Sequence, residues 1–191
     1  LTRDLLDGYA VSKKEGIRPE LQAVGRQARK EIFIILCSGR MVWEKGFDIA
    51  LKALGALKDK EKLRLILSGD GPERHNLEKL ARELKIEDLV SFPGWVSKEK
   101  LLEFLRTADV FILPRWRPEL ASMLLFEAMA FGIPSLVPAG STLAWSAGGG
   151  AMTFQDLNHL DLGGTISKLV SLGEVRVGLS KQALARIEAL H

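Results

Sequence analysis

The sequence predicts an α/β fold in which a doubly wound, Rossmann-like parallel sheet is sandwiched between helices. The chain has 191 residues, 47% of them hydrophobic, which suits one domain with a well-packed core. Short, continuously apolar runs alternate with segments of helical spacing, and such runs are typical of parallel strands that helices cover on both faces. A helix between successive strands also supplies the right-handed crossover that parallel neighbours need.

The expected elements follow this alternation along the chain. Residues 1–30 are charged and poor in apolar positions, which predicts an arm or linker ahead of one domain at 31–191. The expected strands are 32–38, 63–69, 89–92, 108–114 and 134–138, and the expected helices are 47–57, 73–84, 98–108, 119–131, 159–172 and 174–190. Between them, 139–154 reads as a glycine-rich loop that leaves open one more strand at 150–154.

Composition and charge exclude several classes of protein. The 27 Lys and Arg residues and 24 Asp and Glu residues are interspersed, so no basic arm for nucleic acid is expected. Cys37 is the only cysteine, which excludes a disulfide framework and favours a reducing, cytoplasmic setting. The three histidines lack metal-ligand spacing, and no apolar stretch is long enough to span a bilayer.

The loop after the first expected strand, SGRMVWEKG, contains Gly39, Arg40 and Lys45 and leads into a helix. Two cations beside the positive N-terminal end of a helix suit a diphosphate group. The alternative is that both are solvated surface residues, as most charged side chains are. In open parallel sheets, ligands bind beyond the carboxyl ends of the strands, so this loop is a candidate site.

The next two loops at this edge carry weaker signals. In SGDGPER, Gly69 and Gly71 would let the backbone approach a ligand, but Arg74 leaves the GxGxxG pattern incomplete. The same residues also form an ordinary turn whose proline opens the next helix. In PGWVSKEK, Trp95 could lie against a planar base, or it could be a buried tryptophan that closes the core.

Two glutamates, Glu119 and Glu127, lie eight positions apart in RPELASMLLFEAMAFGIP. In a helix they would be separated by about 12 Å of rise and about 80° of rotation, which does not suit the facing carboxylates of a glycosidase. The spacing suits two contacts along an extended ligand. Because its neighbours are apolar, Glu127 needs donors such as ribose hydroxyls, or a basic partner at the helix edge. Glu119 follows a proline and is also a plain helix-start signal.

Together these runs resemble a known family. GRMVWEKGFDIALKAL, LILSGDGPERHNLEKLARELKIEDLVSFPGWVSKEKLLEFLRTADVFILP and ELASMLLFEAMAFGIPSLV, in this order over about residues 32–155, resemble the donor-binding half of retaining group 1 (family 4) glycosyltransferases of the GT-B fold. The resemblance implies a UDP- or GDP-sugar donor, no further cofactor and no metal. Side-chain cations and a helix N-terminus would instead neutralise the leaving diphosphate.

The resemblance also implies roles for individual residues. Arg40 and Lys45 would hold the diphosphate, Glu127 the ribose hydroxyls, and Glu119 would lie near the donor sugar. Arg40, Lys45 and Glu119 are the expected catalytic residues, and the expected donor-binding residues are Gly39, Arg40, Lys45, Gly69, Trp95, Val96, Ser122, Met123 and Glu127.

The chain departs from the family pattern after the first glutamate. Leu120, Ala121 and Ser122 replace a Gly/Pro-Phe-Gly segment, and Ser122 adds a Cβ where close approach is expected, although its hydroxyl could cap the helix. The acceptor-binding half would lie before Leu1 or in a separate subunit, and any peripheral membrane association would run through that half. We therefore expect the isolated domain to bind donor and to transfer nothing. The alternative is a degenerate, non-catalytic module for protein interaction or nucleotide binding; a sugar epimerase fits the spacings less well.

Overall fold

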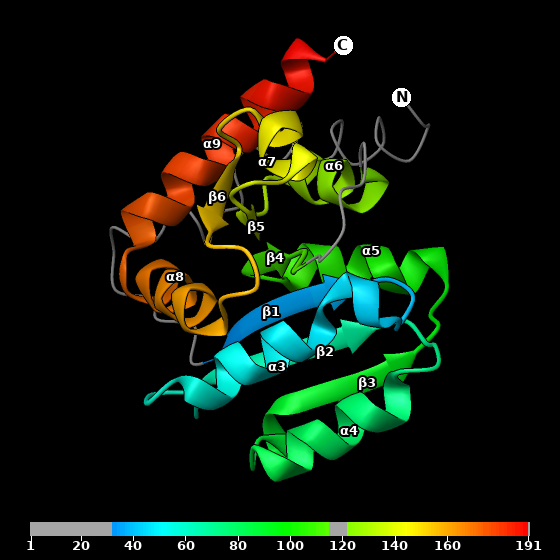
Figure 1. Cartoon of the computed structure of the whole chain (residues 1–191). Helices are drawn as coiled ribbons and strands as arrows, with labels where there is room; N and C mark the ends of the chain where they lie inside the picture. The colour runs from blue at the N-terminus through cyan, green and yellow to red at the C-terminus, as the bar shows by residue number, and fades with distance from the viewer. Residues whose placement is uncertain (1–31, 115–121, 191) are drawn as a thin grey trace.

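The computed structural model describes residues 32–114 and 122–190 of the chain (Figure 1). Its centre is a six-stranded sheet in the order β3-β2-β1-β4-β5-β6, and every neighbouring pair is parallel. The strands are β1 Phe33–Ser38, β2 Leu63–Ser68, β3 Val90–Gly94, β4 Val110–Ile112, β5 Ser135–Pro138 and β6 Ala151–Phe154. The predicted parallel sheet is confirmed, and the strand left open at 150–154 is present as β6.

Helices connect the strands at the expected places. They are α3 Phe47–Ala56, α4 Arg74–Glu83, α5 Lys98–Thr107, α6 Met123–Ala130, α7 Thr142–Ala147, α8 His159–Ser171 and α9 Gly173–Ala189, with 3-10 turns η2 Trp43–Lys45 and η3 Glu87–Leu89. Local capping explains several starts: Ser97 accepts from the Lys100 amide before α5, and Asn158 accepts from two amides of α8.

The prediction of a loop over 139–154 was wrong for α7. The Ser141 side chain accepts a hydrogen bond from the Ala144 amide at 3.3 Å, which caps the start of this helix. Gly148 ends it in the left-handed conformation, with φ of 53°. A helix of six residues among Gly, Ser and Ala is too short to produce a readable apolar periodicity, so the sequence pattern suggested a loop.

Two apolar clusters lie on opposite faces of the sheet, and successive residues of β1 contribute to both. Ile35 and Cys37 belong to the cluster that α3, α4 and α8 cover, whereas Leu36 belongs to the cluster covered by α5, α6, α7 and α9. All three residues are at most 1% exposed. This alternation explains why the strand is continuously apolar, because side chains at odd and even positions both enter a core.

The strand order places a topological switch point between β1 and β4. The chain winds outward from β1 to β2 and β3, and then α5 returns it to β4 on the other side of β1. In doubly wound sheets, the crevice for a ligand forms at the carboxyl ends of the strands at this point. The loop after β1 and the segment after β4 meet there, although 115–121 of that segment lie outside the described residues.

None of the helices in the described part of the chain combines the length and the apolar character needed to cross a bilayer. The predicted arm at 1–30 lies outside the described residues.

Candidate functional site

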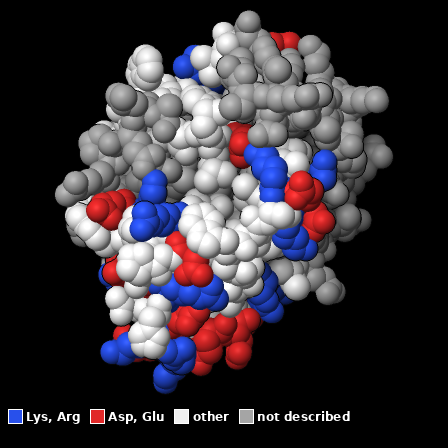
Figure 2. Space-filling model, turned by 90° about the vertical axis from the view of Figure 1, so that its right-hand side faces the viewer, with Lys and Arg blue, Asp and Glu red and all other residues white. Residues whose placement is uncertain are grey.

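Backbone hydrogen bonds join the loops that follow β1, β2 and β3. The Gly39 amide donates to the Ser68 carbonyl at 3.0 Å, and the Gly69 amide donates to the Gly94 carbonyl at 2.8 Å. The three loops thus form one continuous surface at the carboxyl edge. Figure 2 looks at the molecule from this end, where charged side chains of both signs border a central uncharged area.

Close packing between these loops accounts for two of their glycines. Gly69 has φ of +123°, and a Cβ there would lie 1.9 Å from the carbonyl oxygen of Gly39. Gly71 has φ of +157°, and a Cβ there would lie 2.3 Å from the carbonyl oxygen of Met41. Both conformations suit glycine alone. The backbone approaches a neighbouring loop at these positions, and contact between Gly69 and a donor stays a prediction.

Arg74 replaces the last glycine of the incomplete GxGxxG pattern and fastens the second loop to the third. Its Nη2 donates to the Phe92 carbonyl at 2.9 Å, and its Nε donates to Glu78 at 2.9 Å. The hydrogen bond with Glu78 raises the pKa of Arg74 above its ordinary value. A Cβ at Gly94 would lie 3.2 Å from Nη1 of the same guanidinium. Arg74 is therefore a fixed part of the loop framework.

The two cations expected at the diphosphate differ in their surroundings. Arg40 is exposed on the loop after β1, whereas Lys45 is half-buried at the end of η2. Lys45 lines a hollow of about 10 Å³ together with Ser38 of β1 and Ile112 of β4. The structure therefore places Lys45 at the switch point, beside Gly46, where α3 begins. The hollow itself is too small to hold more than one water molecule.

Glu127 is the strongest feature of this region because it is a carboxylate that is only 8% exposed. It lies on α6, and its Oε1 accepts a hydrogen bond from Nζ of Lys98 at 2.8 Å. Lys98 is the first residue of α5 and follows Trp95 by three positions. The ion pair offsets the loss of water around the carboxylate. It also brings together the two segments expected to hold the base and the ribose.

The ion pair of Glu127 bears on the two alternatives that the sequence left open, ribose hydroxyls or a basic partner. A basic side chain, that of Lys98, lies next to the carboxylate, as the alternative of a basic partner at the helix edge requires. An ionised carboxylate has about four acceptor sites on two oxygens, so a single ammonium does not exhaust its capacity. Binding of ribose hydroxyls by Glu127 is compatible with this pair and stays a prediction.

Trp95 does not close the core, because its side chain is 67% exposed. That alternative was wrong. The residue follows β3 at the carboxyl edge, with Val96 half-buried beside it in the sequence. An exposed tryptophan at this edge is available to a planar group, and the contact with a base stays a prediction.

Ser122 and Met123 begin α6 at the same edge. Ser122 is 4% exposed and has φ of −127°, an extended conformation that any residue adopts, so its backbone does not require glycine. Its side chain makes no capping hydrogen bond, so the expectation that its hydroxyl caps the helix was wrong. Met123 is 45% exposed. Because α6 begins at Met123 after the extended Ser122, the expected helix over 119–131 was wrong at its start, and no continuous helix joins Glu119 to Glu127. Glu119, Leu120 and Ala121 lie outside the described residues.

Comparison with known proteins decides the family. A sequence profile described as "Glycosyl transferases group 1" matches residues 20–183, which is most of the chain.

The chain belongs to the group 1 glycosyltransferases.

A curated relative of this group 1 chain is mannosylfructose-phosphate synthase of Agrobacterium fabrum. It is 32% identical over 146 residues, which cover 71% of this chain and 32% of the relative. The chain thus spans about a third of the length of this relative.

Solved structures of low sequence identity share the fold. Sucrose-phosphate synthase of Thermosynechococcus elongatus has a TM-score of 0.75 at 24% identity, over 84% of this chain and 41% of that one. HepE of Anabaena, solved in complex with UDP, has a TM-score of 0.76 at 17% identity, over 96% of this chain and 48% of that one. The expected GT-B half is confirmed as the fold of this chain.

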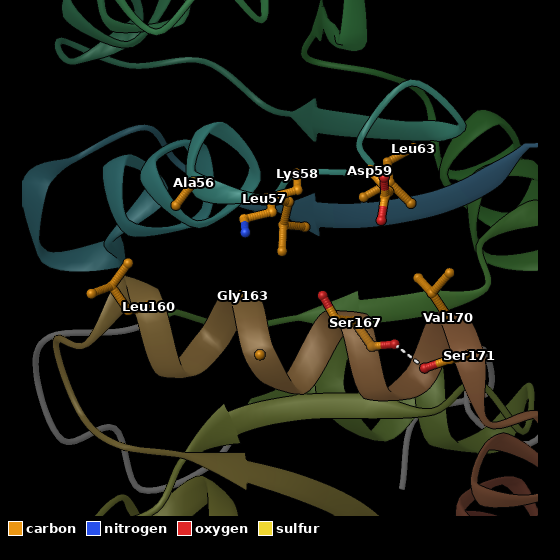
Figure 3. A pocket seen from close by; sticks show the side chains of 11 residues that line it. Ala56, Leu57, Lys58, Asp59, Leu63, Leu160, Gly163, Ser167, Val170 and Ser171 are labelled. Carbon is orange, nitrogen blue, oxygen red and sulfur yellow. Dashed lines mark hydrogen bonds between the residues drawn. The ribbon is translucent and has the colours of Figure 1, made fainter.

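A larger hollow of about 510 Å³ lies away from the loop surface of this group 1 domain (Figure 3). It runs between α8 and the end of α3, where Leu160, Gly163 and Ser167 face Leu57 and Lys58. Its lining is mixed: Lys58, Asp59, Ser167 and Ser171 lie among aliphatic side chains, and the Ser171 hydroxyl donates to the Ser167 carbonyl within α8. The hollow lies away from the carboxyl ends of the strands, where ligands of doubly wound sheets bind. The loop surface at the carboxyl edge, where Lys45 lies, therefore stays the candidate site.

Lys98 is the site residue that sequence reasoning missed. A signal for it exists, because a lysine at the first position of a helix is disfavoured by the positive N-terminal end of the helix dipole. Such a lysine needs an acidic partner, and the apolar surroundings of Glu127 in the sequence indicate an acid that needs a cation. In the described part of the chain, no group of three or more His, Cys, Asp or Glu side chains could hold a metal ion.

Proposed function

We propose that this chain is the donor-binding domain of a glycosyltransferase that moves a sugar from a nucleoside-diphosphate sugar to an acceptor with retention. The observation that supports this most directly is the buried Glu127 held by Lys98 at 2.8 Å, on the helix that follows the switch-point strand β4. A buried carboxylate at the ligand crevice of a doubly wound sheet is a good acceptor for ligand hydroxyls.

The donor would lie along the carboxyl edge of the sheet. Arg40 and Lys45 would bind the diphosphate beside the N-terminal end of α3, where helix amides and two cations favour negative charge. The base would lie against the loop at Trp95 and Val96. Glu127 would accept the ribose hydroxyls, which places the donor sugar toward Glu119 and the start of α6.

The chemistry proposed for this site is stabilisation of a leaving group. As the bond between the sugar and the diphosphate breaks, negative charge grows on the diphosphate oxygens. Fixed cations and the end of a helix dipole stabilise that charge more in the transition state than in the bound donor, which lowers the barrier. In this proposal, Arg40 and Lys45 fulfil the role that a divalent cation fulfils in other transferases.

The acceptor would bind to a part of the enzyme beyond the described domain. The match covers only 32% of the length of the Agrobacterium relative. We propose that an acceptor-binding domain, in the same polypeptide or in a separate subunit, faces the carboxyl edge and completes the active site. Cytoplasmic synthesis of a polysaccharide or glycoconjugate, with any membrane contact made by that second part, fits this arrangement.

Isothermal titration calorimetry of the folded chain with UDP and with GDP tests the proposal. One of the two nucleotides should bind, and Arg40→Ala, Lys45→Ala and Glu127→Ala should each lower the affinity by about 10- to 150-fold, since charge-assisted hydrogen bonds contribute about 1.5–3 kcal/mol. Lys79→Ala is the matched control, because Lys79 is 65% exposed and pairs with Glu83 within α4. No binding of either nucleotide up to millimolar concentration would exclude the proposal.

A further inference from the structure

Lys98 lies where the physics of its own helix disfavours it. It is the first residue of α5, so its ammonium lies at the positive end of the helix dipole. Its ammonium donates a hydrogen bond to Glu127 of α6, which is 29 positions away in the sequence. The side chains of Lys98 and Glu127 are 35% and 9% exposed, so the contact is shielded from solvent mainly on the side of the acid.

We propose that Lys98 is a positioning residue that orients the Glu127 carboxylate toward the ribose of a bound nucleoside diphosphate. This inference rests on the proposed function. Lys98 would act through Glu127 and would itself touch neither the reacting atoms nor the sugar. Its effect should therefore be specific to the ribose hydroxyls of the ligand.

The geometry favours a Lys98 that positions the Glu127 carboxylate over a Lys98 that competes with the ribose hydroxyls for it. The ammonium binds Oε1, and a carboxylate offers about four acceptor sites on its two oxygens, so ribose hydroxyls can be accepted while the ion pair persists. Fixing one oxygen also restricts rotation of the carboxylate before the ligand arrives, which reduces the entropy lost on binding.

Removal of the Lys98 ammonium should change the Glu127 carboxylate as a hydrogen-bond acceptor without changing the rest of the site. A carboxylate that is only 8% exposed is destabilised by desolvation when its cationic partner is lost, so it turns toward water. This reorientation weakens hydroxyl binding. The diphosphate contacts expected of Arg40 and Lys45 do not involve this pair.

The test compares two ligands by isothermal titration calorimetry. The first is UDP, or GDP if the chain prefers guanine, and the second is the matching 2′,3′-dideoxynucleoside diphosphate, which lacks both ribose hydroxyls. Wild type should bind the ribose form more tightly. Lys98→Met should lower affinity for the ribose form about tenfold and leave affinity for the dideoxy form nearly unchanged. The discrimination between the two ligands should therefore fall.

Four further variants, one of them a control, sharpen the test. Lys98→Arg keeps a cation and should restore the discrimination. Glu127→Gln should abolish it, and adding Lys98→Met to Glu127→Gln should cause no further loss, since the two residues act as one unit. Lys100→Met is the matched control, because Lys100 lies in the same helix and pairs with the exposed Glu103 at 2.7 Å. It should behave like wild type.

Each other outcome would overturn the inference. Equal weakening of both ligands by Lys98→Met would show that the lysine only supports the fold, and tighter binding of the ribose form would show that it competes with the ligand. If Lys98→Met does not fold, as judged by circular dichroism, Lys98→Gln carries the same prediction. A wild-type chain that binds neither UDP nor GDP would refute the proposed function itself, whereas binding with unchanged discrimination in Lys98→Met refutes only the role of the lysine.

Discussion

Ser180 and Glu127 are both buried polar residues, and they differ in whether a partner compensates for their burial. Glu127 has the Lys98 ammonium at 2.8 Å. Ser180 is 0% exposed, and its Oγ has no hydrogen-bond partner among the residues that the structure describes. It lies on α9 against Gly132, where a Cβ would come within 2.8 Å of the hydroxyl oxygen. An unsatisfied buried hydroxyl costs about 1–3 kcal/mol, so Ser180 is expected to destabilise the fold.

Ser180→Ala should raise the free energy of unfolding by about 1 kcal/mol. The substitution removes the unpaired oxygen and replaces serine by a better helix former. Urea denaturation followed by circular dichroism measures the change. Ser135→Ala is the control: Ser135 is also 0% exposed, but its Oγ donates to the Ile133 carbonyl at 3.2 Å. That variant should lose about 1 kcal/mol, and a loss of stability in Ser180→Ala would contradict the prediction.

Single residues also mark the limit of what the sequence can predict about the site. The apolar neighbours of Glu127 correctly indicated a carboxylate in need of a partner. Its partner could not be identified, because Lys98 is 29 positions away and only the folded arrangement of the chain brings the two side chains together. Trp95 was weighed as a core residue because tryptophan is large and apolar, but its place at the end of an edge strand leaves it 67% exposed.

At the scale of elements, the strands and long helices could be predicted and the fine structure of the loops could not. Apolar runs of four to seven residues identify buried strands because both faces of this sheet are covered. The loop glycines have no periodicity, so Gly69 and Gly71 were interpreted as positions of ligand approach. The structure shows that they make room for the backbone of the preceding loop, a contact between segments about 30 positions apart.

Substitution by alanine should change the stability of the fold in opposite directions at a loop glycine and at a helix glycine. Gly69 has φ of +123° and no space for a Cβ beside Gly39, so Gly69→Ala should lower the free energy of unfolding by about 1–3 kcal/mol. Gly164 lies inside α8 with nothing within 4 Å of its Cβ position, so Gly164→Ala should raise it by about 0.5–1 kcal/mol. Thermal unfolding of both variants measures the contrast. Equal effects would mean that the loops after β1 and β2 pack less closely than described.

At the scale of the whole molecule, the sheet couples two cores into one folding unit. β1 is the third strand of six, and its alternate side chains fill the clusters on the two faces. The parallel sheet and its two helical layers could be predicted because hydrophobic patterning determines them. The arrangement of the site could not, since it depends on loops that meet only after the strands have been ordered by crossovers.

The single cysteine offers a direct test of this coupling. Cys37 is 0% exposed, and burial raises the pKa of its thiol above the ordinary value, so the native chain should not react with a thiol reagent such as DTNB at pH 8. Because the chain has one cysteine, any reaction reports on the opening of β1. Ile35→Ala and Leu36→Ala each leave a cavity in the core on one face of the sheet. Each should lower the free energy of unfolding by about 2–5 kcal/mol.

In both core variants, loss of helix by circular dichroism and exposure of Cys37 should occur at the same urea concentration, because neither layer is stable without the sheet. Leu160→Ala is the control, since Leu160 is 64% exposed on α8, and it should change stability by no more than about 0.5 kcal/mol. If Cys37 of Ile35→Ala became exposed at a lower urea concentration than the one at which helix is lost, the face covered by α3, α4 and α8 would open alone. That result would contradict a single cooperative unit built on β1.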